Sequence, residues 1–164
     1  MDRRQRPRDT GKNGTEGAWI LVAIDFSEAA REAFRWARRL ARDREAQLKA
    51  LHVVDVHDLA EIAGAAGVPE AQLRRKIAEE RKGRLDAFLD DVEREGSGGS
   101  AERAIVWGTP FEEIVREAIA CEAVLIVMGT RGRSADLERA LFGSTAEKVL
   151  RSAPCPILCV PADV

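Results

Sequence analysis

The chain has 164 residues, of which 45% are hydrophobic and 33% are charged, and its formal net charge is -2. This length suffices for one domain whose core needs no disulfide or metal, and the composition is that of a globular protein rather than a disordered one. No apolar run approaches the roughly 18 residues that cross a bilayer, and the small net charge gives no electrostatic reason to expect nucleic acid as a partner. We expect neither a membrane nor a nucleic-acid interaction.

The first 17 residues are polar and lack the apolar stretch of a secretory signal. They include five basic and three acidic residues and show neither helical nor strand periodicity. Such a segment buries too little apolar surface to offset the entropy of ordering. We predict a disordered polar tail over 1–17, a single domain over 18–164, and a cytoplasmic location.

Five short apolar segments recur along the predicted domain, separated by stretches with helical periodicity. These predicted strands are Trp19 to Ile24, Leu48 to Val54, Ala104 to Trp107, Ala123 to Met128 and Ile157 to Val160. Strands that alternate with helices are joined by right-handed crossovers, which make neighbouring strands parallel. The sequence therefore predicts an α/β fold with a doubly wound parallel sheet and helices on both faces.

Cap and turn residues place the intervening helices. Ser27 is positioned to cap a helix after the first strand, and a long helix is predicted to begin near Glu70. The glycines and proline between 64 and 69 predict a loop before it, and the glycine-serine run over 96–100 predicts a surface loop. A third helix is expected to start with a capping box, for which the residues are Thr109, Pro110 and Glu112.

Ligands of open α/β sheets bind beyond the carboxyl ends of the strands, where the strand order reverses. Asp25 follows the first strand, and Gly129-Thr130-Arg131-Gly132 follows the fourth. Glycines allow positive φ angles and a close approach of backbone N–H groups to an anion. Gly143-Ser144-Thr145 then opens a helix, whose N-terminus attracts anions. Together these segments predict a polyphosphate cradle, although turns and helix caps use the same residue types.

Two common phosphate-binding motifs are excluded. No Gly-Lys-Ser/Thr follows the glycine pair, so the segment is not a Walker A loop, and the glycine-poor turn Asp25-Phe26-Ser27 is not a dinucleotide fingerprint. Cys155 and Cys159 have no His or Cys cluster beside them, so we predict no metal site. We expect structural or solvated roles for His52 and His57.

Six stretches in this order resemble the universal stress protein family from about Trp19 to Val160: ILVAIDFSEAA, LHVVDV, the Gly-Thr-Pro of WGTPFEEIV, VMGTRGRS, FGSTAEKVL and APCPILCV. The resemblance implies an adenine nucleotide alpha hydrolase-like sheet of order 3-2-1-4-5 and the ATP-binding subgroup of the family. It further implies a homodimer built by the strand from Ile157 to Val160.

The resemblance also implies a set of nucleotide-binding positions. Asp25 and the backbone of Val53 would face ribose and adenine, Met128 would line the base or sugar, and glycines and hydroxyls would hold the phosphates. The full set is Ala23, Ile24, Asp25, Val53, Met128, Gly129, Arg131, Gly132, Gly143, Ser144 and Thr145. The expected cofactor is ATP with Mg²⁺. Asp25 could instead cap the turn that follows it, and Arg131 could be an ordinary exposed loop residue.

One spacing departs from the family pattern. Nine residues usually separate the second and third glycines, whereas Arg133 to Phe142 makes ten. The extra residue, near Ser134 to Asp136, could bulge at the loop tip or shift Gly143 away from the phosphates. Asp136 adds a negative charge near the predicted anion site.

The favoured function is an ATP-binding regulatory module in the stress response, without catalytic residues. The first alternative is a slow ATP hydrolase or self-phosphorylating protein, in which Ser144 or Thr145 accepts phosphate with the aid of a divalent metal. Against it, the sequence has no evident general base or catalytic metal pair. The second alternative is a dimeric interaction protein that has lost nucleotide binding because of the longer spacer.

Overall fold

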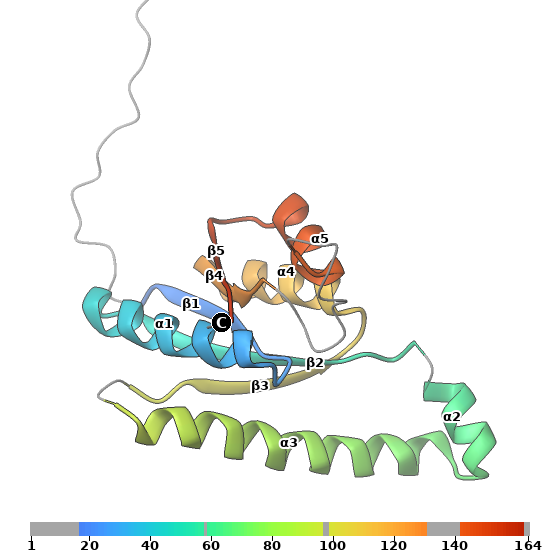
Figure 1. Ribbon diagram of the computed structural model, residues 1–164. Coiled ribbons are helices and arrows are strands. Elements are labelled where there is room, and N and C mark those ends of the chain that lie inside the picture. The colour runs from blue at the N-terminus through green and yellow to red at the C-terminus, as the bar shows by residue number, and fades with distance from the viewer. Residues whose placement is uncertain (1–16, 58, 97–98, 131–141, 163–164) are drawn as a thin grey trace, which may run out of the picture.

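The computed structural model describes residues 17–57, 59–96, 99–130 and 142–162. Within these ranges strands and helices alternate along the chain (Figure 1). The elements are β1 (Trp19–Ala23), α1 (Glu28–Arg44), β2 (Gln47–Val54), α2 (Leu59–Ala66), α3 (Glu70–Arg94), β3 (Glu102–Trp107), α4 (Pro110–Ala120), β4 (Ala123–Gly129), α5 (Ser144–Ser152) and β5 (Ile157–Val160). No helix in the described part of the chain has both the length and the hydropathy needed to span a bilayer.

The strands form one parallel sheet in the order β3-β2-β1-β4-β5, which confirms the predicted fold. In its register, Ile20 of β1 lies opposite Leu48 of β2 and Leu125 of β4. The strand order reverses between β1 and β4, because the chain proceeds from β1 toward β3 and then returns to add β4 and β5. The carboxyl ends of β1 and β4 therefore border the switch point where such sheets bind ligands.

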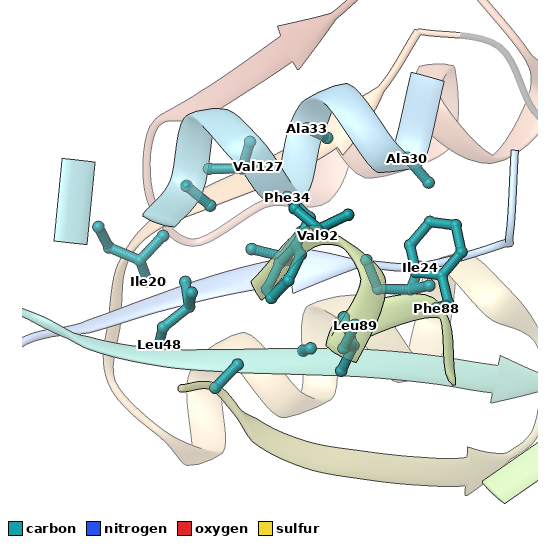
Figure 2. Close-up of a cluster of buried hydrophobic side chains, with 14 of the residues drawn as sticks. Ile20, Ile24, Ala30, Ala33, Phe34, Leu48, Phe88, Leu89, Val92 and Val127 are labelled. Carbon is teal, nitrogen blue, oxygen red and sulfur yellow. The ribbon is translucent and has the colours of Figure 1, made fainter. Parts of the chain in front are cut away.

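Helices cover both faces of the sheet (Figure 1). Phe34 of α1 and Leu89 and Val92 of α3 point into one core, which they share with alternate residues of β1, β2 and β4 (Figure 2). The opposite core contains Leu21 and Leu51 from the sheet and is closed by α4 and α5. Because side chains alternate along a strand, each central strand contributes to both cores, which explains its continuous apolar sequence.

The helix starts agree with the sequence in two cases. Ser27 caps α1, since its Oγ accepts a hydrogen bond from the Ala30 amide at 3.1 Å, and α3 begins at Glu70. The loop predicted around 64–69 is only partly correct, because α2 extends from Leu59 to Ala66. Leu59 and Ala63, four residues apart, are both buried and give this short helix an apolar face.

The third predicted helix start is correct in position but not in its side-chain bond. α4 begins at Pro110 after Thr109, yet the Thr109 side chain makes no cap hydrogen bond. The backbone makes the first bond of the helix instead, because the Glu113 amide donates to the Thr109 carbonyl at 3.1 Å. The predicted capping box is therefore wrong in its hydrogen bonding, although the proline stands at the first helical position as expected.

Gly129 ends β4 directly against the first turn of α1. A Cβ atom built on Gly129 would lie 2.7 Å from the Ala29 Cβ and 3.2 Å from the Ala30 amide nitrogen. Gly129 does not adopt a positive φ, so the conformational reason expected for this glycine is wrong. Gly129 is required by space, because α1 approaches β4 too closely for any side chain.

We predict that Gly129→Ala lowers the free energy of unfolding by about 1 to 3 kcal/mol, because backbone atoms of α1 must move to admit the methyl group. Gly83→Ala is the matched control. Gly83 lies within α3, and a Cβ atom at this position would meet nothing within 4 Å. Alanine there should raise stability by about 1 kcal/mol through helix propensity. Urea unfolding of both variants measures the two effects, and equal stabilities would contradict the packing argument.

Candidate functional site at the carboxyl edge of the sheet

The turn after β1 is anchored to β2 through the backbone of Ile24. Its amide donates to the Leu51 carbonyl at 2.8 Å, and its carbonyl lies 2.8 Å from the Nδ1 atom of His52. A carbonyl can only accept, so His52 carries its proton on Nδ1. Both polar backbone groups of Ile24 are thus bonded, and its side chain is buried in the α1/α3 core. Ile24 therefore anchors the turn after β1 to β2.

Asp25 shapes the next step of the turn. Its Oδ1 accepts from the Ser27 amide at 3.0 Å and from the Ser27 Oγ at 2.5 Å. Ser27 in turn caps α1, so the structural alternative for Asp25 is confirmed: this carboxylate stabilises the turn that starts the helix. A carboxylate has two oxygens, and the bonds to Ser27 are made by Oδ1. The structural role and a ligand role are therefore compatible.

Phe26 completes the turn in a left-handed conformation, with φ of 65°. This region is unfavourable for a bulky residue and is maintained only when the surroundings determine it. The Phe26 ring lies 4.4 Å from the His52 ring and 5.7 Å from the Phe88 ring, centroid to centroid. The Arg84 guanidinium lies 4.3 Å from the Phe26 centroid. These contacts from β2 and α3 stabilise the strained turn.

The two halves of the predicted cradle meet through the backbone. The Gly143 amide donates to the Thr130 carbonyl at 2.8 Å, and the Thr130 amide donates to the Val160 carbonyl at 2.9 Å. The N-terminus of α5 therefore lies beside Thr130 at the end of β4, and Ser144 and Thr145 form the first turn of this helix. The Gly143 cap makes no side-chain hydrogen bond, as a glycine requires. Arg131 and Gly132 lie outside the described residues.

The remaining predicted site residues lie on one face of the sheet, opposite Ile24 and His52. Ala23 and Val53 pack at the border of the core under α4 and α5, and Met128 is buried in it. This is the face on which α5 begins, so these three positions and the Gly143 turn belong to one side of the sheet. Ile24 and His52 belong to the other side, where α1 and α3 lie.

His52 was expected to be structural, and its burial shows how. The side chain is only 8% exposed, and burial lowers the pKa of the imidazole below its ordinary value of 6.5. The positive charges of Arg81 and Arg84 lower the pKa further, whereas the Ile24 carbonyl and Asp25 oppose this shift. The ring is therefore neutral near pH 7. Sequence reasoning missed its link to the turn, because His52 and Ile24 are 28 residues apart.

A cavity of about 330 Å³ lies at the other end of the sheet. It is lined by residues that begin strands, including Trp19, Gln47 and Glu102, together with Arg38 and Arg42 at the end of α1. Parallel sheets bind ligands at the carboxyl ends of their strands, so this cavity is distinct from the candidate site.

The sequence matches the family model described as "Universal stress protein family" over residues 19–161. It is 35% identical over 143 residues to universal stress protein MJ0531 of Methanocaldococcus jannaschii, a match that covers 86% of this chain and 80% of the relative. The solved structure of MJ0577 from the same organism is similar with a TM-score of 0.75 and 28% identity, covering 92% of this chain and 99% of the other. A universal stress protein of Archaeoglobus fulgidus, solved in complex with dAMP, has the same fold with a TM-score of 0.60 at 24% identity, covering 89% and 99% of the two chains.

We predict that stability decreases as the pH falls below 6.5 in a way that depends on His52. The folded-state pKa is lowered, so the unfolded chain binds the proton first and acidification favours unfolding. Urea unfolding between pH 7 and pH 5 should show a weaker pH dependence for His52→Asn than for the wild type. An NMR titration that places the His52 pKa at or above 6.5 would contradict the assigned environment.

Proposed function

The chain belongs to the universal stress protein family, and we propose that it binds ATP, with Mg²⁺, as a nucleotide-dependent regulatory module in the stress response. The proposed site lies at the carboxyl ends of β1, β2 and β4. The observation that supports it most directly is the hydrogen bond from the Gly143 amide to the Thr130 carbonyl. This bond brings the N-terminus of α5 together with the end of β4 at the switch point of the sheet.

The phosphates would lie against backbone rather than side chains. The first amides of α5 have no partner within the helix and point out of its N-terminus, where the helix dipole favours negative charge. The hydroxyls of Ser144 and Thr145 add donors at the same end. Gly143 presents no side chain that would separate a phosphate from these amides. Arg131 and Gly132 are further candidates on the sequence motif alone.

The adenosine would lie along β1, β2 and β4. Asp25 offers Oδ2 to a ribose hydroxyl while Oδ1 remains bonded to Ser27. Val53 offers its backbone to adenine near the carboxyl end of β2, and the side chains of Ala23 and Met128 line the same face of the sheet. Apolar walls with a few directed polar groups are typical of nucleotide sites.

The dAMP complex of the Archaeoglobus fulgidus protein supports the class of ligand. That protein has the same fold and was solved with an adenine nucleotide bound. At 24% identity the similarity concerns the fold and not the individual site residues. The proposal for this chain therefore depends on its own residues at the carboxyl edge.

We predict that the purified protein retains or binds ATP and that Gly143→Val weakens binding by about 100-fold, or ~2.8 kcal/mol. Gly143 has φ of -69° and ψ of 159°, which valine adopts without strain, so the expected loss comes from filling the phosphate space. Calorimetry with ATP and Mg²⁺ measures the affinity, and mass spectrometry of gently purified protein detects a retained nucleotide.

Gly83→Val is the matched control for this experiment. It makes the same change on the exposed side of α3, away from the proposed phosphates, and should leave the affinity unchanged. Absence of heat and of a thermal shift with ATP in the wild type would overturn the proposal and favour an interaction protein. Phosphate release that Gly143→Val abolishes would instead favour an ATP hydrolase.

We further propose that the protein forms a homodimer through β5, which is an outer strand of the sheet. The Ile126 amide donates to the Pro156 carbonyl, and the Thr130 amide donates to the Val160 carbonyl. Backbone groups of alternate residues face alternate sides in a parallel ladder, so those of Ile157 and Cys159 face the edge away from β4. An edge of this kind is a template for pairing with a second copy.

The dimer proposal predicts a wild-type mass of twice 18.0 kDa by light scattering at micromolar concentration. Cys159→Pro removes an outward donor and adds a ring at the edge, so this variant should be a monomer with the β4–β5 ladder intact. Cys159→Ala, which keeps the amide, should remain a dimer. A monomeric wild type, or a dimeric proline variant, would contradict the proposed interface.

A further inference from the structure

His52 contacts the residues on both sides of Asp25. Its Nδ1 atom donates to the carbonyl of Ile24, which precedes Asp25, and its ring lies against the ring of Phe26, which follows. Asp25 itself points into the Ser27 turn through Oδ1. Both neighbours of Asp25 in the chain, Ile24 and Phe26, are therefore in contact with the His52 side chain of β2. These two contacts help to determine where the Asp25 carboxylate lies.

The contact to Ile24 is one that water cannot easily replace. His52 is 8% exposed and Ile24 is 3% exposed, so a lost hydrogen bond would leave the carbonyl without a partner in an apolar environment. The free-energy cost of such an unpaired carbonyl decreases when the turn moves so that another donor or water can bond it. Any movement of Ile24 displaces Asp25, because the two residues share a peptide plane.

The contact to Phe26 acts on the same turn from its other end. A left-handed φ at a phenylalanine persists only while the ring has a defined site. His52, Phe88 and Arg84 form that site around the Phe26 ring. Of these three residues, His52 alone also bonds the backbone of the turn at Ile24.

We propose that His52 is a positioning residue for nucleotide binding: from the far face of the sheet it holds the β1–α1 turn so that the Asp25 Oδ2 faces the ribose. His52 does not touch the nucleotide, since it lies on the α1/α3 side whereas Ala23, Val53 and Met128 line the other. This inference depends on the proposed function and adds to it a residue that acts through Asp25.

Two substitutions separate positioning from simple core packing. His52→Leu retains an apolar volume but removes the donor, whereas His52→Asn is smaller and carries an amide nitrogen close to the place of the imidazole Nδ1. If His52 acts by positioning, the affinity for ATP should depend on whether residue 52 keeps a hydrogen-bond donor. His52→Leu should then bind ATP about tenfold more weakly than the wild type, and the affinity of His52→Asn should lie within about threefold of the wild type. Packing alone predicts that affinity follows stability, which thermal unfolding of the same samples measures.

A double-mutant cycle with Asp25→Asn tests whether His52 acts through Asp25. The asparagine side-chain oxygen can still accept from Ser27 and preserve the turn, but its NH₂ group replaces the accepting Oδ2. In that background His52→Leu should cause no further loss of affinity beyond about twofold, because the accepting Oδ2 that His52 would position has been replaced by an NH₂ group.

The outcomes are distinct. If the wild type binds no adenine nucleotide, the proposed function fails and this inference fails with it. If the wild type binds ATP but His52→Leu binds equally well, only the inference is overturned. A loss in His52→Leu that persists in full in the Asp25→Asn background would also overturn it, because His52 would then act independently of Asp25.

Discussion

The close packing of α1 against the end of β4 is the constraint on which the carboxyl edge depends. Gly129 has no side chain, so the first turn of α1 lies directly against the β4 backbone at Ala29. This contact brings the start of α1 next to the end of β4. The Thr130 carbonyl then binds the Gly143 amide and sets the start of α5. The approach of α1 to Gly129 and the bond from Gly143 to Thr130 thus bring the starts of α1 and α5 to the end of β4.

The two faces of the sheet have different tasks at this edge. On the α1/α3 face, His52, Phe26 and Arg84 form a buried and cation-covered support for the turn after β1. On the α4/α5 face, Ala23, Val53 and Met128 present a mainly apolar surface beside the N-terminus of α5. A ligand on the second face would be held by atoms whose positions are determined on the first.

Most polar groups of the proposed site belong to the backbone. The amides at the start of α5 and the Val53 backbone offer dipoles, and Asp25 is the charged side chain among the described candidates. Backbone dipoles bind a polyphosphate without supplying a strong general base.

The sequence by itself determined the elements and their order. The sheet order 3-2-1-4-5, which the structure confirms, was implied by the resemblance to the universal stress protein family. Apolar runs bounded by turn residues predicted all five strands, and Ser27 and Glu70 marked helix starts. These features are local, because hydrophobic periodicity and capping depend on residues a few positions apart. Two local predictions were wrong: α2 was not expected, and the predicted side-chain cap bond of Thr109 is not formed. Both features depend on contacts with residues outside the local sequence.

Only the tertiary structure decided why particular residues stand at the site. Gly129 is a glycine because α1, which is distant in the sequence, lies in van der Waals contact with it in space. His52 supports Asp25 through Ile24 and Phe26, and this link exists only because β1 and β2 pair in one register. The meeting of Gly143 with Thr130 likewise depends on how α5 packs over the sheet. Such contacts are set by the three-dimensional arrangement of distant segments, which no local pattern encodes.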